Sequence, residues 1–328
     1  MNVSNKTALV TGANSGLGFE AARQLANDGW GRVILACRTE QKAEDARAKL
    51  VKETGKDPFG VLAVDTSEVA SAIGASDKLR ETGESIDFLL LNAGATGAQP
   101  NFNSDGVEIT WASTLVGHHV MTMHLLSNGL LSPGARIVIA GSEGARGNVA
   151  PMKVHDIDQV AQEQFGGDQV AAIDALSRIK GPYKFKSFNE YVTAKLVVAW
   201  WAAALSRKLP SGMTVNAVSP GSALDSSFAR NAPVWMRVIM IPMMKILGPI
   251  LGIAGPLDTA ARRYLEAAEL SDHETGNFYA TAHRKKLVGP VAVQTWPEYF
   301  THEASQEAGF DAVVRMTGVA FPEGVAPM

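Results

Sequence analysis

Short apolar runs alternate with helix-forming stretches along most of this 328-residue sequence, and no other feature constrains the fold as strongly. Continuous apolar strands suit a sheet that is covered on both faces, and helices between them connect parallel strands. The pattern therefore predicts an α/β fold with a doubly wound parallel sheet. Six strands are predicted: TALVTG (7–12), RVILAC (32–37), GVLAVD (60–65), DFLLLNAG (87–94), ARIVIAGS (135–142) and MTVNAVSPG (213–221).

A late run, GNFYA (276–280), brings the predicted sheet to about seven strands. The sequence contains no repeat, low-complexity segment or linker, so we predict a single domain over residues 1–328. Helices are predicted after the strands, for example at 17–28, 39–54, 106–126 and 190–208. Three regions depart from the alternation: a polar insert at about 144–187, an apolar stretch at about 226–256 and a tail at about 284–328.

Composition limits the class of protein and its partners. A hydrophobic content of 46% with 19% charged residues is typical of a globular chain. The net charge of −3 comes from interspersed signs with no basic stripe, which predicts no nucleic-acid partner. The single cysteine, Cys37, excludes an internal disulfide and suits a reducing compartment. The first residues show no secretory signal, so we expect a cytoplasmic protein.

The string TGANSGLG (11–18) directly follows the first predicted strand and opens a helix. Glycines there let the backbone turn tightly and approach a pyrophosphate, whose charge is stabilised by the helix N-terminus. The spacing is G-x-x-x-G-x-G and not the usual G-x-G-x-x-G, and glycine-rich turns also serve simple connections. Its position at the first strand-to-helix turn favours a Rossmann-type nucleotide site.

The end of the second strand reads LACRTE, with Arg38 after Cys37 and no acid until Glu40. An acid at this point would bind the ribose 2′-hydroxyl of NAD, whereas an arginine accommodates the 2′-phosphate of NADP. The alternative is an arginine that merely begins a solvated helix. Given the glycine motif, the sequence favours NADP(H).

Tyr191 and Lys195 lie four positions apart in FNEYVTAKL (188–196), so they share one face of a predicted helix. A nearby cation lowers the pKa of a phenol, which ordinarily lies near 10, and makes it a usable proton donor or acceptor near neutrality. Of the five tyrosines only Tyr191 has a Lys or Arg at +4. Taken alone, this spacing is better explained by coincidence.

Six motifs in one order change that assessment: TGANSGLG, LACR, LNAG (91–94), IVIAGS (137–142), YVTAK (191–195) and NAVSPG (216–221). In this order they resemble the short-chain dehydrogenase/reductase family over roughly residues 5–283. LVGHHVMTMHLL and PLDTAARRYLEAAELSDHETGNFYA are similar to segments of the branch that contains retinol dehydrogenases and protochlorophyllide reductases. The resemblance is specific because all six motifs are in register.

The resemblance implies roles for individual residues. Tyr191 would donate a proton to a carbonyl or remove one from an alcohol, Lys195 would lower the tyrosine pKa and bind the nicotinamide ribose, and Ser142 would hydrogen-bond the reacting oxygen. The implied cofactor-binding residues are Gly12, Asn14, Ser15, Gly16, Leu17, Gly18, Arg38, Asp65, Thr66, Asn92, Ala93, Gly94, Tyr191, Lys195, Pro220, Gly221 and Ser222. The implied cofactor is NADP(H), with no metal.

The sequence departs from the family pattern in two places. Thr114 stands where the family usually has an asparagine that helps to hold a water next to the lysine. A threonine hydroxyl can bond a water but has no amide, so Thr114 is a candidate catalytic residue with a proton relay that departs from the family's. In addition, 49 positions separate Ser142 from Tyr191, more than is usual in the family. The insert is therefore expected to loop out and border the substrate entrance.

Other interpretations explain the sequence less well. AGSEG (140–144) approaches the G-x-S-x-G elbow of serine hydrolases, but Ala140 replaces its first glycine. His118, His119 and His124 match no metal motif, and ordinary packing explains their spacing. The stretch VWMRVIMIPMMKILGPILGI (234–253) is interrupted by two charges and two prolines, so we expect a lid over an apolar pocket, compatible with peripheral membrane contact, and no spanning helix.

The sequence thus predicts an NADP(H)-dependent oxidoreductase that acts on a bulky apolar carbonyl or alcohol substrate. A catalytically weak NADP-binding sensor or interaction protein is the alternative, and Thr114 is the feature that favours it. Light-driven reduction of a tetrapyrrole double bond, an activity of the same branch, also stays open. A homo-oligomer is compatible with the sequence, with Trp200 and Trp201 on helix 190–208 as a candidate interface.

Overall fold

The fold was obtained as a computed structural model, which describes residues 3–181, 184–222, 254–284 and 286–325. Its centre is an eight-stranded sheet in the order β3-β2-β1-β4-β5-β6-β7-β8. The first seven strands are parallel, and β8 pairs antiparallel with β7. The strands are β1 (Thr7–Thr11), β2 (Arg32–Cys37), β3 (Phe59–Ala63), β4 (Ile86–Leu91), β5 (Leu131–Ala140), β6 (Thr214–Val218), β7 (Phe278–Thr281) and β8 (Val291–Val293).

This topology confirms the predicted α/β class and the seven predicted strands. The eighth strand was missed because β8 has only three residues, and two of them, Val291 and Val293, are exposed. A short exposed run at a sheet edge has no apolar periodicity to detect. The chain order reverses between β1 and β4, and such a switch point opens a crevice at the carboxyl ends of the strands.

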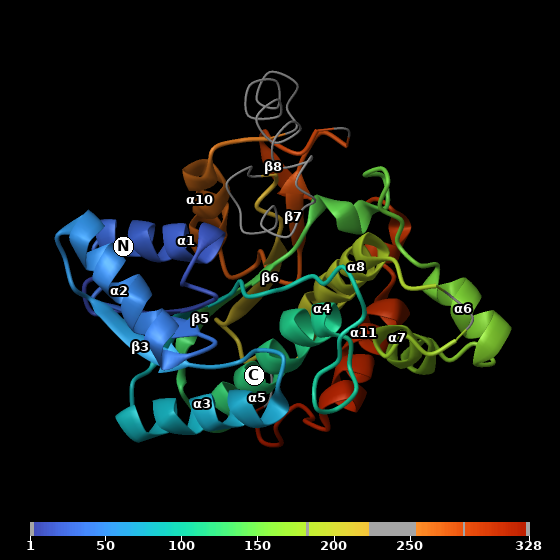
Figure 1. Cartoon of the computed structure of the whole chain (residues 1–328), viewed down its shortest axis with the longest axis horizontal. Coiled ribbons are helices and arrows are strands. Elements are labelled where there is room, and N and C mark those ends of the chain that lie inside the picture. The colour runs from blue at the N-terminus through green and yellow to red at the C-terminus, as the bar shows by residue number, and fades with distance from the viewer. Residues whose placement is uncertain (1–2, 182–183, 223–253, 285, 326–328) are drawn as a thin grey trace.

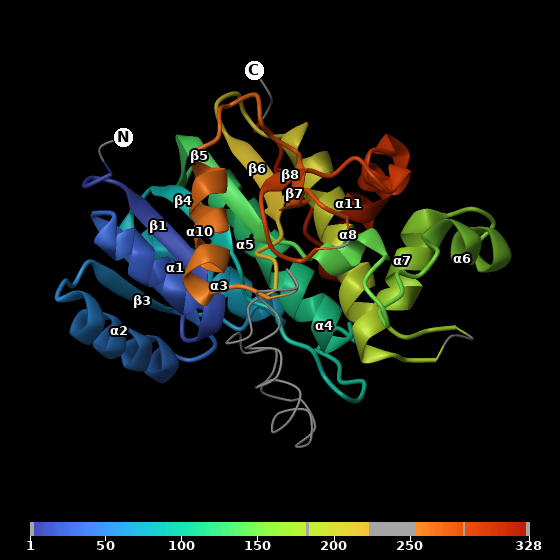
Figure 2. The same cartoon turned by 90° about the horizontal axis from the view of Figure 1, so that it is seen from above.

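Helices cover both faces of the sheet (Figures 1 and 2). One face carries α1 (Gly16–Asn27), α2 (Glu40–Thr54) and α10 (Leu257–Ala268). Alternate residues of a strand supply the two cores, so Ala8 and Val10 pack on this side and Leu9 on the other. The other face carries α3 (Val69–Thr82), α4 (Ile109–Trp111), α5 (Gly117–Ser127), α8 (Ser187–Ser206) and α11 (Glu303–Thr317).

A five-residue π-helical segment, Ala112–Val116, interrupts the helix that was predicted over 106–126. Next to it Gly117 lies directly against the backbone of Thr66, where an added Cβ would come within 2.5 Å of the Thr66 Cα. The Gly117 N–H donates to the Thr66 carbonyl (2.9 Å), and the Thr66 hydroxyl donates to the Ser113 carbonyl (3.1 Å). The wider helical turn thus accompanies a close contact with the end of β3.

The insert does not simply loop out, as its polar sequence had suggested. It forms a 3-10 helix, η2 (Glu143–Arg146), and two short helices, α6 (Ile157–Gln164) and α7 (Gln169–Ser177). Ile157, Ile173 and Leu176 are buried in the main core. The buried apolar residues of the insert are few and are separated by polar turns, so its sequence shows no helical periodicity.

The tail packs against the catalytic-helix candidate α8. Helix α11 lies along α8 and α7, and both Trp200 and Trp201 are almost fully buried. The Trp200 indole donates to the Tyr299 carbonyl (2.6 Å) and the Trp201 indole to His119 Nδ1 (3.0 Å). The expectation that these tryptophans form an oligomer interface is therefore wrong, because the chain's own tail covers them.

The predicted apolar lid falls mostly on residues 223–253, which lie outside the described residues. Across the described ranges, no helix combines the length and apolar character needed to span a bilayer.

Candidate active site

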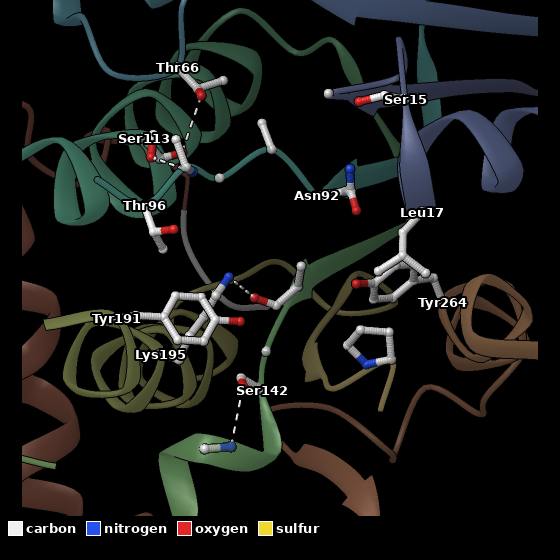
Figure 3. Close-up of a pocket in the computed structure, with 18 of the residues that line it drawn as sticks. Ser15, Leu17, Thr66, Asn92, Thr96, Ser113, Ser142, Tyr191, Lys195 and Tyr264 are labelled. Atoms are coloured by element: carbon white, nitrogen blue, oxygen red, sulfur yellow. Dashed lines mark hydrogen bonds between the residues drawn. The ribbon is translucent and has the colours of Figure 1, made fainter. Parts of the chain in front are cut away.

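A cavity of about 660 Å³ lies at the carboxyl ends of the parallel strands, where the sheet topology places its crevice. The strand ends and the turns that follow them form most of its wall (Figure 3). Of the predicted site residues, all line this cavity except Gly16, Gly18 and Thr114. The structure therefore gathers side chains that are up to about two hundred positions apart, such as Gly12 and Ser222.

The glycine turn after β1 brings two chain segments into close backbone contact. Gly12 has a φ of +68°, and a Cβ there would lie 3.1 Å from the Ala93 Cα. A Cβ on Gly18 would lie 2.5 Å from the Gly12 carbonyl oxygen, which explains why Gly18 packs α1 onto the turn and does not line the cavity. Gly16, with a φ of +58°, begins α1.

The N-terminus of α1 opens toward the cavity. Ser15 at the N-cap has an extended backbone, and its side chain makes no capping bond. Ser15 and Asn14 both line the cavity. Backbone N–H groups at a helix start, together with the partial positive charge of the helix end, bind phosphate groups. This end of the cavity is therefore suited to a pyrophosphate.

Two basic side chains line the cavity next to β2. Arg38 is a little over half exposed, and its Nε lies 3.2 Å from the Asp65 carboxylate. Asp65 is fixed in turn by the Ser67 amide (3.0 Å) and hydroxyl (2.6 Å). Lys42, in the first turn of α2, also lines the cavity and was missed by the sequence reasoning, which had no motif to mark it.

Ser142, Tyr191 and Lys195 meet at the other end of the cavity. The Tyr191 side chain is hydrogen-bonded to Ser142, whose hydroxyl also accepts the Gly144 N–H (3.2 Å). Lys195 is buried, and its Nζ donates to the Ala140 carbonyl (2.6 Å) and lies 5.9 Å from the Tyr191 ring centre. Figure 3 shows the three side chains facing the same space from β5 and α8.

Burial is the largest influence on the pKa values of Tyr191 and Lys195. Burial raises the pKa of Tyr191 above its ordinary value, and the hydrogen bond from Ser142 only partly opposes the shift. Burial also lowers the pKa of Lys195 to about 7, so its ammonium is only partly charged near neutrality. Lys195 is not among the influences on the Tyr191 pKa in this structure, where desolvation of the phenol is the largest, so the lysine's effect on the tyrosine stays a prediction.

Thr114 lies behind the cavity wall. It is buried in the π-helical segment, and its Oγ1 is 3.5 Å from where a Cβ on Gly94 would stand. The Thr114 carbonyl accepts the Nδ1–H of His118 (2.9 Å). The neighbouring Ser113 lines the cavity instead, and its hydroxyl accepts the Ala95 N–H (2.9 Å). A role for Thr114 in proton transfer stays a prediction.

His118 and His119 serve as packing residues with both ring nitrogens engaged. Because His118 Nδ1 donates to a carbonyl, its Nε2 accepts the Thr11 hydroxyl (2.9 Å). His119 accepts the Trp201 indole at Nδ1, and its Nε2–H donates to the Val319 carbonyl (2.7 Å). Within the described ranges, no three His, Cys, Asp or Glu side chains are grouped as metal ligands.

Several cavity residues could not be recognised from sequence. Tyr264 of α10 is buried with its ring in the core, yet it lines the cavity opposite Tyr191 (Figure 3). Val149 and Met152 come from the insert, and Leu287 comes from the tail. Val149, Met152 and Leu287 belong to the insert and the tail, which carry no motif, so the sequence contained no signal for them.

Comparison with known proteins agrees with this geometry. Residues 6–154 match the family model described as short chain dehydrogenase. The WW domain-containing oxidoreductase of Drosophila melanogaster is 29% identical over 70% of this chain and 52% of its own. The chain thus spans about half the length of the first curated relatives that it matches.

Two other relatives match larger shares of their own length. Human retinol dehydrogenase 13 is 30% identical over 67% of this chain and 60% of its own. The chloroplastic protochlorophyllide reductase of Chlamydomonas reinhardtii is 25% identical over 94% and 74%.

A solved structure shows the same fold. The short chain dehydrogenase of Burkholderia cenocepacia in complex with NADP superposes with a TM-score of 0.59 at 21% identity, over 85% of this chain and 96% of that one. The matched motifs, the strand order and the relatives agree: residues 6–154 match the short-chain dehydrogenase family, and the chain is similar over a longer range to a retinol dehydrogenase and a protochlorophyllide reductase.

Proposed function

We propose that the protein is an NADP(H)-dependent oxidoreductase that interconverts a carbonyl and an alcohol on a bulky apolar substrate. The observation that supports this most strongly is the hydrogen-bonded Tyr191 and Ser142 pair, with Lys195 one helical turn away, in the same cavity as the glycine turn. A phosphate-binding helix end and a proton-transferring phenol in one cavity match the two halves of such a reaction.

The residues around the cavity fit NADP(H). The α1 N-terminus with Ser15 would hold the pyrophosphate, and Arg38 with Lys42 would face the 2′-phosphate. Lys195 and the Pro220–Ser222 segment would lie along the nicotinamide end. When bound, this cofactor supplies or accepts the hydride.

The remaining chemistry falls to the chain itself. Tyr191 would give its proton to the carbonyl oxygen during reduction, or remove it from the alcohol during oxidation. Ser142 would donate a hydrogen bond to the same oxygen as negative charge develops on it. The raised pKa keeps the Tyr191 phenol protonated at neutral pH, which suits a proton donor in the direction of reduction.

The apolar substrate class is supported by the wall near Tyr191. Val149, Met152 and Leu287 line the cavity there, and each buried CH₂ of a ligand contributes roughly 0.8 kcal/mol. The predicted lid at about 226–256 would add to this wall, and it stays a prediction because residues 223–253 lie outside the described ranges.

NADPH oxidation against a panel of aryl and alkyl ketones and aldehydes tests the proposal. Tyr191→Phe should lower kcat by about 10²–10⁴-fold, because it removes one proton donor and leaves the ring in place. NADPH affinity should stay nearly unchanged. Tyr279→Phe is a matched control, since that hydroxyl bonds to Asn277 and does not line the cavity. Retained activity in Tyr191→Phe would contradict the assignment.

A second candidate is an NADP-binding sensor with weak catalysis. Thr114, which stands at the position of the family's asparagine, is buried and does not line the cavity, and this favours the sensor. Tight NADPH binding without oxidation of the cofactor by any member of the panel would support this function over the first.

A further inference from the structure

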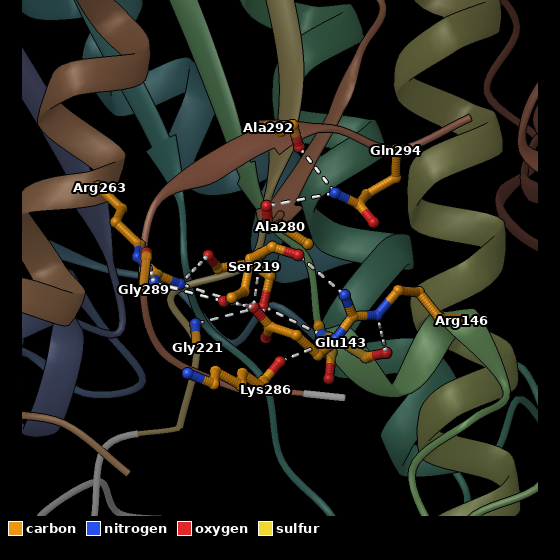
Figure 4. Close-up of polar contacts among 12 residues, drawn as sticks. Glu143, Arg146, Ser219, Gly221, Arg263, Ala280, Lys286, Gly289, Ala292 and Gln294 are labelled. Carbon is orange, nitrogen blue, oxygen red and sulfur yellow. Dashed lines mark hydrogen bonds and ion pairs between the residues drawn. The ribbon is translucent and has the colours of Figure 1, made fainter. Parts of the chain in front are cut away.

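Three charged side chains are buried together beside Ser142. Glu143, Arg146 and Arg263 are 4%, 1% and 7% exposed, and they come from η2 and α10 (Figure 4). Charged residues are rarely buried so fully unless they are paired, and a buried group of this kind costs more than apolar residues of the same volume. The contacts of this cluster show which chain segments it positions.

Glu143 joins the ends of three strands. It accepts the hydroxyl of Ser219, which follows β6, and its Oε1 accepts the amide (3.2 Å) and hydroxyl (3.0 Å) of Thr281, which ends β7. Arg263 Nη1 lies 3.5 Å from the same oxygen. The carboxylate thus ties the residue after Ser142 to the turns that follow the next two strands.

Arg146 extends this connection to the tail. Its Nη1 donates to the Thr281 carbonyl (2.9 Å), and its Nη2 donates to the Lys286 carbonyl (3.3 Å). A second contact joins the same two regions: the Asn148 amide donates to the Arg284 carbonyl (2.8 Å). The start of the insert is thereby bonded to the segment that follows β7.

The tail segment 286–289 forms part of the cavity wall. Leu287 lines the same cavity as Tyr191, and its carbonyl accepts the Ser222 N–H (3.2 Å). Gly221 has a φ of +81°, and a Cβ there would come within 2.5 Å of the Leu287 carbonyl oxygen. Arg263 Nη2 holds the far end of the segment through the Gly289 carbonyl (2.8 Å).

We propose that Leu287 is a specificity-determining residue for the substrate and that Arg146 is the positioning residue that keeps it in the cavity wall. This inference rests on the proposed function. Two fixed points, the Lys286 carbonyl on Arg146 and the Gly289 carbonyl on Arg263, flank Leu287. The segment between them has little freedom, so the Leu287 side chain presents one defined surface to the substrate.

Leu287→Ala and Leu287→Phe test the first half of the inference. Ketones of increasing size are compared by kcat/KM with NADPH and, independently of turnover, by their Kd for the protein with NADP⁺ bound. Leu287→Ala should shift the optimum to larger ketones and weaken binding of the ketone that wild type prefers about tenfold. Leu287→Phe should exclude the largest members. An unchanged size dependence of Kd in both variants would overturn the role of Leu287.

Arg146→Met tests the second half, because it keeps an unbranched side chain and removes the contacts to the Thr281 and Lys286 carbonyls, together with the local contact to the Glu143 carbonyl. We expect the size dependence to flatten, with kcat/KM for the preferred ketone reduced about tenfold. Amide hydrogen exchange of free protein should rise at least tenfold in peptides that contain Ser222 or Leu287. Arg146→Lys should restore part of both effects, since an ammonium can still donate to one carbonyl.

Arg136→Met is the matched control. Arg136 lies on β5, away from the cavity, where it bonds the Gly134 and Gly212 carbonyls and pairs with Asp272. Melting temperatures separate global destabilisation from the local effect. If Arg146→Met leaves exchange and the size dependence as in Arg136→Met, its positioning role is wrong. If wild type oxidises no NADPH with any ketone, the proposed function fails, while the Kd and exchange measurements still decide the inference.

Discussion

The two ends of the cavity are built by different physical means. At the end formed by β1, β2 and β4, close backbone contacts at Gly12 and Gly18 shape the wall, and apolar strands support it. At the end formed by β5, β6 and β7, buried charges at Glu143, Arg146 and Arg263 shape the wall. The first end is marked by short motifs, although Gly12 also meets Ala93 from a distant segment, whereas the second end depends on side chains that are far apart in sequence.

This difference has consequences for stability and for binding. Backbone contacts at glycines tolerate no side chain, but they carry no charge that must be kept neutralised. A buried ion pair loses its compensation as soon as one partner is removed. We therefore expect the charged end to be the more sensitive of the two to isosteric substitution, and the glycine end to be the more sensitive to added volume.

The largest expected effect is at the charged end. Glu143→Gln keeps the volume but leaves two buried guanidinium groups without their carboxylate, so the free energy of unfolding should fall by about 3–5 kcal/mol. Urea unfolding followed by circular dichroism measures this. Asp57→Asn, which breaks the exposed pair with Arg47, should change stability far less. Equal losses of unfolding free energy in the two variants would contradict the special sensitivity expected of the charged end.

The stability of the protein in acid tests the glycine end, where His118 contacts Thr11. Burial lowers the pKa of His118 to about 3 and that of His119 to about 4, from an ordinary value of 6.5. Unfolded chains take up these protons below about pH 6.5 and the folded protein does not, so stability is lost as the pH falls from 6.5 toward 3.

His118→Gln tests this, because His118 joins the Thr11 turn to the π-helical segment. The variant should show a smaller slope of unfolding free energy against pH between 6 and 4, whatever its stability at pH 7. A slope equal to that of wild type would mean that His118 takes up its proton at the same pH in the folded and the unfolded chain.

A smaller effect is expected for Arg38, at the exposed edge of the glycine end. Arg38→Gln should raise the Kd for NADPH about tenfold or more and leave the Kd for NADH unchanged, since a charge-assisted bond to phosphate is worth about 1.5–3 kcal/mol. Lys42→Gln should act in the same direction more weakly. Fluorescence titration decides, and equal affinities for the two cofactors in wild type would contradict the NADP(H) assignment.

At the glycine end the sequence predicted most of the residues that line the cavity, because the turn glycines, the apolar strands and Arg38 each stand in a short motif. Lys42 was missed because no motif marks it. The spacing of Tyr191 and Lys195 placed them on one helix face, and the six motifs in order, not the spacing alone, identified them as a candidate catalytic pair.

The sequence misjudged features that depend on distant partners. The depressed pKa expected for Tyr191 considered only the neighbouring lysine, whereas desolvation is the largest influence on both groups in the fold. Trp200 and Trp201 looked available for an interface until α11, about one hundred residues later, covered them. Thr114 lies in the π-helical segment with its hydroxyl next to Gly94, and it is not among the residues that line the cavity.

By itself the sequence determined the α/β class, the seven parallel strands, the glycine turn and the Tyr191–Lys195 spacing, because periodicity and backbone sterics act between near neighbours. Only the tertiary structure decided what surrounds the reacting end of the cavity. Arg146 and Lys286 are separated by 140 positions, and nothing in either neighbourhood predicts that a guanidinium will meet that carbonyl. Burial of a charge is tolerated only when such partners converge, and convergence is a property of the folded chain.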